Sequence, residues 1–216
     1  MTKGSEWMTA SFLSQSKYGK YGNSLYTGAN KEVYQNKSSS FITGSSNGTP
    51  SQDTTNTQCK YNDLTDRGSG TGYCGGGAST TGNIYGIYDM SGGSWEYQMS
   101  NYNKMSGYDT SSNSGFNGSL NKGGSITNGK DFPDSKYYDL YTTDDVATAC
   151  NGLCYGLIET KDWYGDYDGF VDASDPWLLL GGYWHNGTSA GMFNVHDNSD
   201  GYGNSSRSFR IALTTQ

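Results

Sequence analysis

The chain has 216 residues with a formal net charge of −7 and an aromatic content of 14 %. The acidic balance and the lack of a Lys/Arg cluster argue against a nucleic-acid binder, which presents a basic face, and no apolar run approaches the ~20 residues that span a bilayer. We therefore expect no nucleic-acid partner and no direct membrane insertion of this segment. Because disordered chains are poor in aromatic residues, the composition predicts one folded domain over residues 1–216 with an aromatic core.

The first half of the chain contains one predicted helix and two long loops. Residues 3–16 place Trp7, Ala10 and Leu13 near helical spacing, which predicts an amphipathic helix. Residues 35–82 are dominated by turn-forming residues without periodicity, and we interpret them as a long insertion, either ordered or a loose linker. Residues 100–135 form a second long loop insertion of the same composition.

Short strands are predicted between and after these loops. Residues 83–90 alternate in a way that predicts a strand buried on both faces. Residues 177–182, 190–195 and 208–213 are predicted as strands separated by polar loops. Short strands scattered among long loops, with one clear helix, predict a loop-rich α+β domain.

The four cysteines form two close pairs, Cys59 with Cys74 and Cys150 with Cys154. A zinc site would need Cys-x-x-Cys knuckles or nearby histidines. Two interpretations stay open: two local disulfides, which form in an oxidising compartment, or four reduced, partly buried thiols. With the richness in Tyr, Ser, Gly and Asn, the disulfide interpretation predicts an extracellular or cell-surface location. The first residues do not resemble a signal peptide, which leaves two interpretations: a cytoplasmic protein, or a piece of a longer exported chain. The composition favours the second, so we expect part of a longer exported chain.

Three glycine- and aromatic-rich motifs lie in the second half of the chain: GIYDMSGGSWEY at residues 86–97, LGGYW at 180–184 and SFRIAL at 208–213. In this order they resemble the G-L-Y-D-M-x-G-N-x-W-E-W, R-G-G-S-W and closing G-F-R motifs of the formylglycine-generating-enzyme-like type of the C-type lectin fold. The resemblance covers residues 83–97 and 177–213. It implies an α+β domain with short antiparallel strands and one or two helices.

Most of the chain is also similar to a group of Firmicutes surface proteins that includes pilin-like members. The similarity rests on Glu6-Trp7 followed by LSQSKYG at 13–19, on STTGNIYG at 79–86 and on PDSKYYD at 133–139. It implies a domain exposed on the cell surface, on a pilus or on a phage particle.

The same fold is used by the variable proteins of diversity-generating retroelements, whose C-terminal loops are rewritten at template adenines. Residues 196–208, HDNSDGYGNSSRS, contain only residue types that adenine changes in Asn codons can produce. Chance is the alternative explanation, because these residue types are common throughout the chain.

The resemblance implies a variable C-terminal surface that binds a ligand. For Trp184 a place in the core is the alternative interpretation, since the matching family residue is buried. The candidate ligand-binding residues are Trp184, His185, Asn186, Ser189, Met192, Asn194, His196, Asp197, Asn198, Asp200, Tyr202, Asn204 and Arg207.

Catalytic chemistry is not expected. Enzymes of the resembled family use a reactive Cys pair near the last strands, and no Cys lies between Gly182 and Phe209. We therefore predict a non-catalytic, receptor- or adhesin-like domain that recognises a protein or a glycan. A structural pilus or adhesin domain without a ligand site is the alternative, and a formylglycine-generating-type enzyme is the least supported one.

The sequence leaves open one structural cofactor, a calcium ion. Glu96 matches the position of a calcium-ligating Glu of the family, but Gly93 replaces the Asn of that motif. The second interpretation is a buried carboxylate that pairs with Arg210 or caps backbone amides. The acidic segments at 166–172 and 197–201 also offer oxygen ligands for calcium, although solvated acidic turns are the favoured interpretation. No other cofactor is expected.

Overall fold

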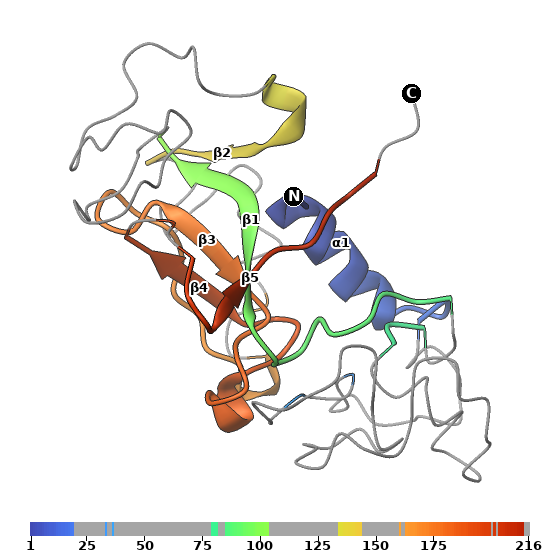
Figure 1. Ribbon diagram of the computed structural model, residues 1–216. Helices are drawn as coiled ribbons and strands as arrows, with labels where there is room; N and C mark the ends of the chain where they lie inside the picture. Colours follow the sequence, from blue (N-terminus) through green and yellow to red (C-terminus); the bar gives the residue numbers. More distant parts are fainter. Residues whose placement is uncertain are drawn as a thin grey trace, which may run out of the picture.

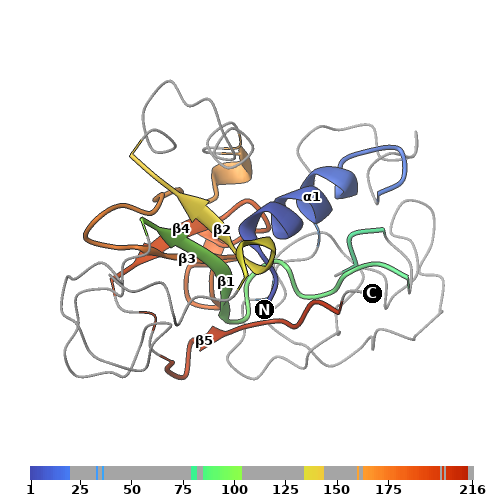
Figure 2. The same ribbon diagram turned by 90° about the horizontal axis from the view of Figure 1, so that it is seen from above.

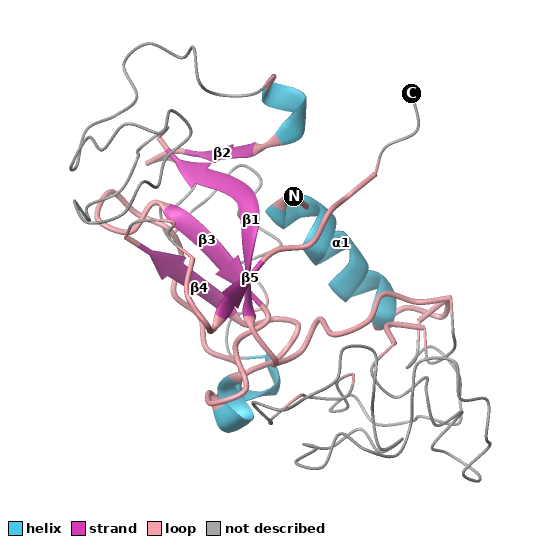
Figure 3. Ribbon diagram, viewed as in Figure 1, coloured by secondary structure: helices cyan, strands magenta, loops and turns pink. Residues whose placement is uncertain are grey.

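The computed structural model describes residues 1–19, 33, 36, 79–81, 85–103, 134–143, 160, 163–199, 201 and 203–213. These residues form a mixed α/β structure with one α-helix and a five-stranded sheet (Figure 1). Short 3₁₀ turns, η3, η4 and η5, and irregular loops connect them (Figure 3). The elements are α1 (Gly4–Ser14), β1 (Trp95–Tyr102), η3 (Ser135–Tyr137), β2 (Asp139–Tyr141), η4 (Trp163–Gly165), β3 (Trp177–Leu180), η5 (Gly187–Ser189), β4 (Val195–Asn198) and β5 (Arg207–Ser208).

The sheet has the strand order β2-β1-β3-β4, and β5 also pairs with β1. Glu96 is the register partner of Leu180 in β3 and of Ser208 in β5. Since β2 likewise pairs with the far end of β1 at Ser100–Tyr102, β5 and β2 lie along the same edge of β1. Both pair with β1 in parallel, whereas β1–β3 and β3–β4 are antiparallel. The expected short antiparallel strands are therefore present in β1, β3 and β4, and the two parallel pairings with β1 were not expected.

The predicted N-terminal helix is confirmed as α1, but the buried side of the helix differs from the expected one. Trp7 and Met8 are buried, whereas Leu13 is 52 % exposed. A Cβ on Gly4 would lie 2.9 Å from a Leu178 methyl group, so any larger residue there would push that buried side chain aside. Ser11 is also buried, and its hydroxyl donates to the backbone of α1 and of the 191–194 turn. Small residues thus replace the expected apolar stripe because the helix lies close to the strands.

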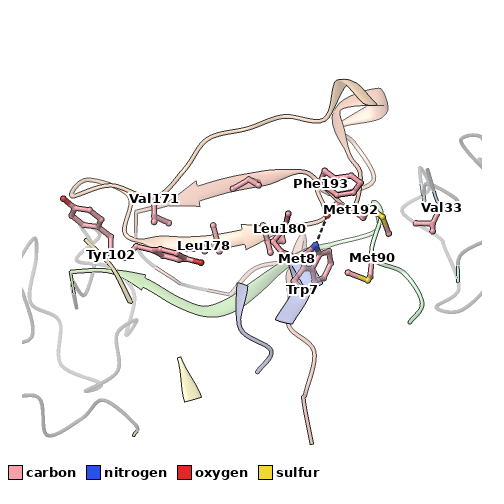
Figure 4. Packing of buried hydrophobic residues seen from close by; sticks show 12 residues of the cluster. Trp7, Met8, Val33, Met90, Tyr102, Val171, Leu178, Leu180, Met192 and Phe193 are labelled. Atoms are coloured by element: carbon pink, nitrogen blue, oxygen red, sulfur yellow. Dashed lines mark hydrogen bonds between the residues drawn. The ribbon is translucent and has the colours of Figure 1, made fainter. Parts of the chain in front are cut away.

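The main core lies between α1 and the sheet, which Figure 1 and Figure 2 both show with α1 to one side, next to β1. The Trp7 indole N–H donates to the Met192 carbonyl at 2.8 Å, as Figure 4 shows. This hydrogen bond connects α1 to the turn that precedes β4. The buried residues of this cluster are Trp7, Met8, Val33, Met90, Tyr102, Tyr141, Val171, Leu178, Leu180, Met192, Phe193 and Val195.

Two predicted strands are displaced and one is absent from the described residues. Residues 85–90 form no strand, and Tyr85 is 87 % exposed. The strand predicted at 190–195 begins only at Val195, because the preceding residues turn inward. The strand predicted at 208–213 is reduced to β5, and Phe209, Ile211 and Leu213 are exposed rather than in the core. In that segment Arg210 lies inward, where it pairs with a buried carboxylate.

Several predictions fall on other parts of the chain. Cys59, Cys74, Cys150 and Cys154 lie outside the described residues, so the disulfides stay a prediction. The two long insertions also lie mostly outside them, but the second was predicted to begin too early, because β1 continues to Tyr102. Among the described residues, no helix has the length and apolarity needed to cross a bilayer.

Candidate functional site

The face of the sheet away from α1, here called the second face, carries aromatic and polar side chains. The alternation in β3 separates the two faces: Leu178 and Leu180 belong to the main core, whereas Leu179 packs with Tyr97 and Trp177. The strand register then assigns side chains of β1, β4 and β5 to the second face. Those side chains are Trp95, Tyr97, His196, Asn198 and Arg207.

A chain of aromatic rings in contact with one another extends from the second face into the neighbouring loops, and we call it the ring cluster. The Trp95 ring centroid lies 4.3 Å from that of Tyr183 and 5.0 Å from that of His196. His196 in turn lies 5.0 Å from Tyr167. At the other end, His185 stacks on Tyr183 at 6.0 Å and contacts Trp184 at 5.0 Å. Both histidines of the chain therefore belong to one aromatic assembly. The ring cluster consists of Tyr167, His196, Trp95, Tyr183, Trp184 and His185.

The ring cluster is partly open to solvent. Tyr167 is 47 % exposed. His185 is also exposed, and the other four rings are half-buried. Rings that are held by one another and still exposed offer contact area with few torsions to freeze on binding.

Backbone hydrogen bonds hold the loops that carry these rings. The Tyr167 amide donates to Ser189 at 3.0 Å, and the Tyr167 carbonyl accepts from the Val195 amide at 2.9 Å. Gly182 has φ +69°, and a Cβ there would lie 2.7 Å from the Cβ of Ala190, so the turn before Tyr183 requires glycine. The ring cluster is thus attached to the sheet rather than to free loops.

A polar group on the second face joins three strands. The Tyr97 hydroxyl donates to Asn198 Oδ1 at 2.8 Å and accepts from Arg207 Nη1 at 3.3 Å. The Arg207 guanidinium lies 5.9 Å from the Tyr97 ring centroid, within reach of a cation–π contact. The Gly201 amide also donates to Asn198 Oδ1, at 3.2 Å. The segment that connects β4 to β5 is therefore anchored to this face at Gly201.

Three carboxylates interact electrostatically near the end of β4, and one of them, Asp197, lies next to His196. His196 Nδ1 is 3.2 Å from Asp197 Oδ1, and Asp172 Oδ1 accepts from the Asp175 amide at 3.0 Å. Partial burial raises the pKa of Asp175, the charges of Asp197 and Asp172 raise it further, and His196 lowers it. Among the described residues, no Lys or Arg forms an ion pair with these carboxylates. The edge is thus negatively charged beside the ring cluster.

The predicted site residues divide into several groups. His196, Asn198 and Arg207 lie on the second face, and Trp184 and His185 belong to the ring cluster.

Other predicted residues shape the loops or the edge. Asn186 Oδ1 accepts from the Tyr183 amide at 2.8 Å, and the exposed Asn204 accepts from the Ser206 amide at 2.8 Å. The half-buried Ser189 accepts from Tyr167 through its carbonyl. Asp197 lies at the acidic edge described above, whereas Asp200 and Tyr202 lie outside the described residues.

Met192 and Asn194 were wrongly expected on the exposed surface. Met192 is fully buried against α1, and its carbonyl accepts from Trp7. Asn194 is 1 % exposed, and its side-chain Nδ2 donates to the Ser189 carbonyl at 2.6 Å. Both are buried because residues 190–194 form a turn directed toward the main core.

Sequence reasoning did not assign Trp95, Tyr97, Tyr167 and Tyr183 to the site. For Trp95 and Tyr97 a signal was present, because they alternate with Glu96 and therefore share one face of a strand. Tyr167 and Tyr183 stand in loops, where local periodicity says nothing about their neighbours. Only the pairing of 166–169 with 193–195 brings Tyr167 to His196.

The pairing of Glu96 with Arg210 is confirmed. Both carboxylate oxygens accept from the guanidinium, which also donates to the carbonyls of Tyr88 and Asp89 at 3.1 and 3.2 Å. Burial raises the pKa of the Glu96 carboxyl, and the hydrogen bonds and charge of Arg210 oppose that rise. A calcium ion at Glu96 stays a prediction, and it would have to compete with the guanidinium for both oxygens.

The acidic segment at 166–172 is not uniformly solvated. Asp166 is 2 % exposed, so its expected place in a solvated turn was wrong. Burial raises the pKa of the Asp166 carboxyl to about 8, and the hydrogen bond from the Phe193 amide opposes the rise. Among the described residues, no group of three or more His, Cys, Asp or Glu side chains is placed to hold a metal ion.

Comparisons of the chain with protein-family models, with curated proteins and with solved structures found no match.

Proposed function

We propose that this chain is a non-catalytic ligand-binding domain of the receptor or adhesin kind, and that the ring cluster and the second face form its binding site. The observation that carries the proposal is the partly exposed ring cluster beside Arg207. Binding hot spots are enriched in Trp, Tyr and Arg, and this surface presents all three residue types on a hydrogen-bonded frame. The partner is a protein or a glycan.

We also propose that the mixed α/β structure is a C-type lectin fold of the formylglycine-generating-enzyme-like type. It is supported by the three motifs and by their meeting in one sheet, where Glu96 of the first motif pairs with Leu180 of the second and with Ser208 of the third. The matching motif elements are thus neighbours, as a shared fold requires.

We further propose that the chain is the variable protein of a diversity-generating retroelement. The segment 196–208 begins in β4 and ends in β5, and it contributes His196, Asn198 and Arg207 to the second face. None of these three side chains belongs to the main core. Changes in them would alter the binding surface while α1 and its core stay the same, which is the separation that a variable receptor needs.

The location follows from the same proposal. A variable receptor acts on targets outside the cell, so we place the domain at a cell, pilus or phage surface, within a longer exported chain and with the two predicted disulfides closed.

A structural pilus or adhesin domain is the second candidate. The observation in its favour is a set of exposed apolar side chains away from the ring cluster: Phe209, Ile211 and Leu213 are 60 %, 71 % and 94 % exposed. Such side chains suit burial against a neighbouring subunit. A domain of this kind would need no variable surface.

Sequencing of this coding region from many cells of one strain separates the two candidates. The variable-receptor proposal expects the differences to concentrate within residues 183–208, at adenine positions, with a near-copy of that segment beside a reverse-transcriptase gene. An even spread of differences along the chain would contradict it and favour the structural domain.

A further inference from the structure

We infer that the segment after β5, residues 209–213, pairs as an antiparallel strand with the same segment of a second copy of the chain, so that the domain forms a symmetric dimer. This inference goes beyond the proposed binding function and does not depend on it.

The side chains of this segment alternate in exposure. Phe209, Ile211 and Leu213 are 60 %, 71 % and 94 % exposed. Arg210 and Ala212, which stand between them, are half-buried. Figure 1 shows the segment continuing from β5 in an extended path past α1. A period of two residues is that of a β-strand with one face toward solvent, so the segment presents three large apolar side chains on one open face.

One edge of the segment is used within the molecule and the other edge is open. The Arg210 carbonyl accepts from the Thr2 amide at 3.1 Å, and the Thr2 carbonyl accepts from the Met99 amide of β1 at 2.7 Å. Because backbone groups of successive strand residues point to opposite edges, those of the three exposed residues point away from β1. Among the described residues, the backbone groups of these three have no hydrogen-bond partner.

The open edge carries none of the features that keep other strands away. Exposed edge strands usually contain charged residues or Pro, which prevent pairing with another chain. Residues 208–213, SFRIAL, contain no Pro and a single charge, Arg210. That charge is neutralised within the molecule, since the guanidinium forms an ion pair with Glu96. The segment is therefore suited to pair with a further strand.

A second copy of the chain supplies the matching strand. With a two-fold axis at Ile211, antiparallel pairing places Ile211 opposite its own copy and Phe209 opposite Leu213 on both sides of the axis. All three cross-strand pairs are then apolar, and such pairs stabilise a sheet. Residues opposite each other in this register exchange both backbone hydrogen bonds, so the open groups of all three residues gain partners together. A foreign strand would have to match this spacing, whereas a copy matches it by symmetry.

Charge also favours this segment as the contact between copies. Each copy has a formal net charge of −7, so two copies repel each other over most of their surface. Phe209, Ile211 and Leu213 are uncharged, and their contact adds no further repulsion. The interface is small, and we therefore expect a dimer whose population depends on concentration.

The test is sedimentation velocity of the purified chain over a range of concentrations. We expect the mass to rise with concentration from that of one chain to that of two. Ile211→Lys places two like charges opposite each other at the two-fold axis and should raise the dissociation constant at least tenfold. Ile211→Glu should do the same for the same reason.

Mixing the two variants tests the register. In an equimolar mixture of Ile211→Lys and Ile211→Glu, opposite charges face each other at the axis. The mixture should therefore associate at least tenfold more tightly than either variant alone. This rescue requires that residue 211 of one copy lies against residue 211 of the other.

A matched control separates this edge from general apolar association. Leu13 in α1 is 52 % exposed, so Leu13→Lys places the same charge on an exposed apolar position of another element. This variant should dimerise as the wild type does. Circular dichroism should show that all three variants are folded.

Three results would overturn the inference. One is a mass that stays at that of one chain up to about 1 mM protein, since specific association is tighter than that. The others are a dimer that Ile211→Lys leaves unchanged and a mixture that associates no better than its two components. Failure of the proposed binding function would appear instead in the sequencing experiment, which does not depend on the dimer.

Discussion

The two faces of the sheet are built from neighbouring residues yet differ in kind. On the face toward α1, Leu178, Leu180 and Val195 are completely buried among apolar side chains. On the second face, Leu179, Trp177 and Tyr97 form a smaller buried cluster. Trp95, His196 and Asn198 on the same face are only half-buried. One residue along β4, from Val195 to His196, changes the environment from full to partial burial, whereas all four residues of β3 are buried. The difference teaches that stability and recognition can be separated within single strands.

The same contrast recurs in the loop before β3. Asp166 is buried beside the turn that contains Phe193, whereas its neighbour Tyr167 is exposed on the side of His196. Alternation along an extended segment sends successive side chains to opposite sides. Substitutions on the buried side should therefore change stability, whereas substitutions on the exposed side should change binding.

The largest loss of stability is expected from the α1 side. Trp7→Ala removes a buried ring and its hydrogen bond to Met192, and we expect a loss of about 3–5 kcal/mol in the free energy of unfolding. Urea denaturation measures it. Leu13→Ala in the same helix is the control, because Leu13 is 52 % exposed and should change stability by less than ~0.5 kcal/mol. Equal losses in both variants would show that the buried side of α1 is assigned wrongly.

The second largest effect concerns pH and Asp166. The folded-state pKa of about 8 lies above the usual Asp value of 3.8, so the folded protein holds a proton that the unfolded chain releases. The stabilisation that this proton contributes is fully present below the pKa of Asp166 in the unfolded chain. It is lost as the pH rises through the pKa of Asp166 in the folded protein. Asp166→Asn removes this titratable group. As the pH rises from 5 to 8, the free energy of unfolding of the variant should therefore increase by about 3 kcal/mol relative to that of the wild type. Urea denaturation of both proteins across this pH range measures the difference, and parallel stability curves would contradict the prediction.

A smaller effect is expected at the ion pair that connects β1 to the C-terminal segment. Glu96→Gln leaves the Arg210 guanidinium with a neutral partner and should cost about 2 kcal/mol. The double variant Glu96→Gln/Arg210→Gln should cost less than the sum of the two single variants, because the pair is lost only once. Thermal or urea unfolding of the four proteins completes the cycle. Strict additivity would mean that the two side chains do not interact in solution.

The smallest effect on stability is expected on the second face. Arg207→Ala removes a cation–π contact and one hydrogen bond of a half-buried side chain, and should cost no more than about 1 kcal/mol. Binding of the target should nevertheless weaken clearly, as measured by calorimetry once a target is known. A loss as large as that of Trp7→Ala would show that this face belongs to the core and would end the comparison of the two faces.

Some features were predictable because they are local. The helix at 4–14 follows from apolar spacing without helix-breaking residues, and β3 follows from the short run WLLL. The pairing of Glu96 with Arg210 was among the interpretations of the motif residues. Other expectations were wrong where the burial of a residue depends on segments that are distant in the sequence. Met192 and Asn194 looked like surface residues until the turn at 190–194 was seen against α1.

The sequence by itself determined the α+β composition, the helix, the run that becomes β3 and the residue types available for recognition. The tertiary structure alone decided that Trp95, Tyr167, Tyr183 and His196 meet in one ring cluster, since these residues come from four separate segments. It also decided the parallel pairing of β2 and β5 with β1. The physical reason is that periodicity reports which side of an element is apolar. Strand register, set by packing across the whole domain, decides which side chains from different elements become neighbours.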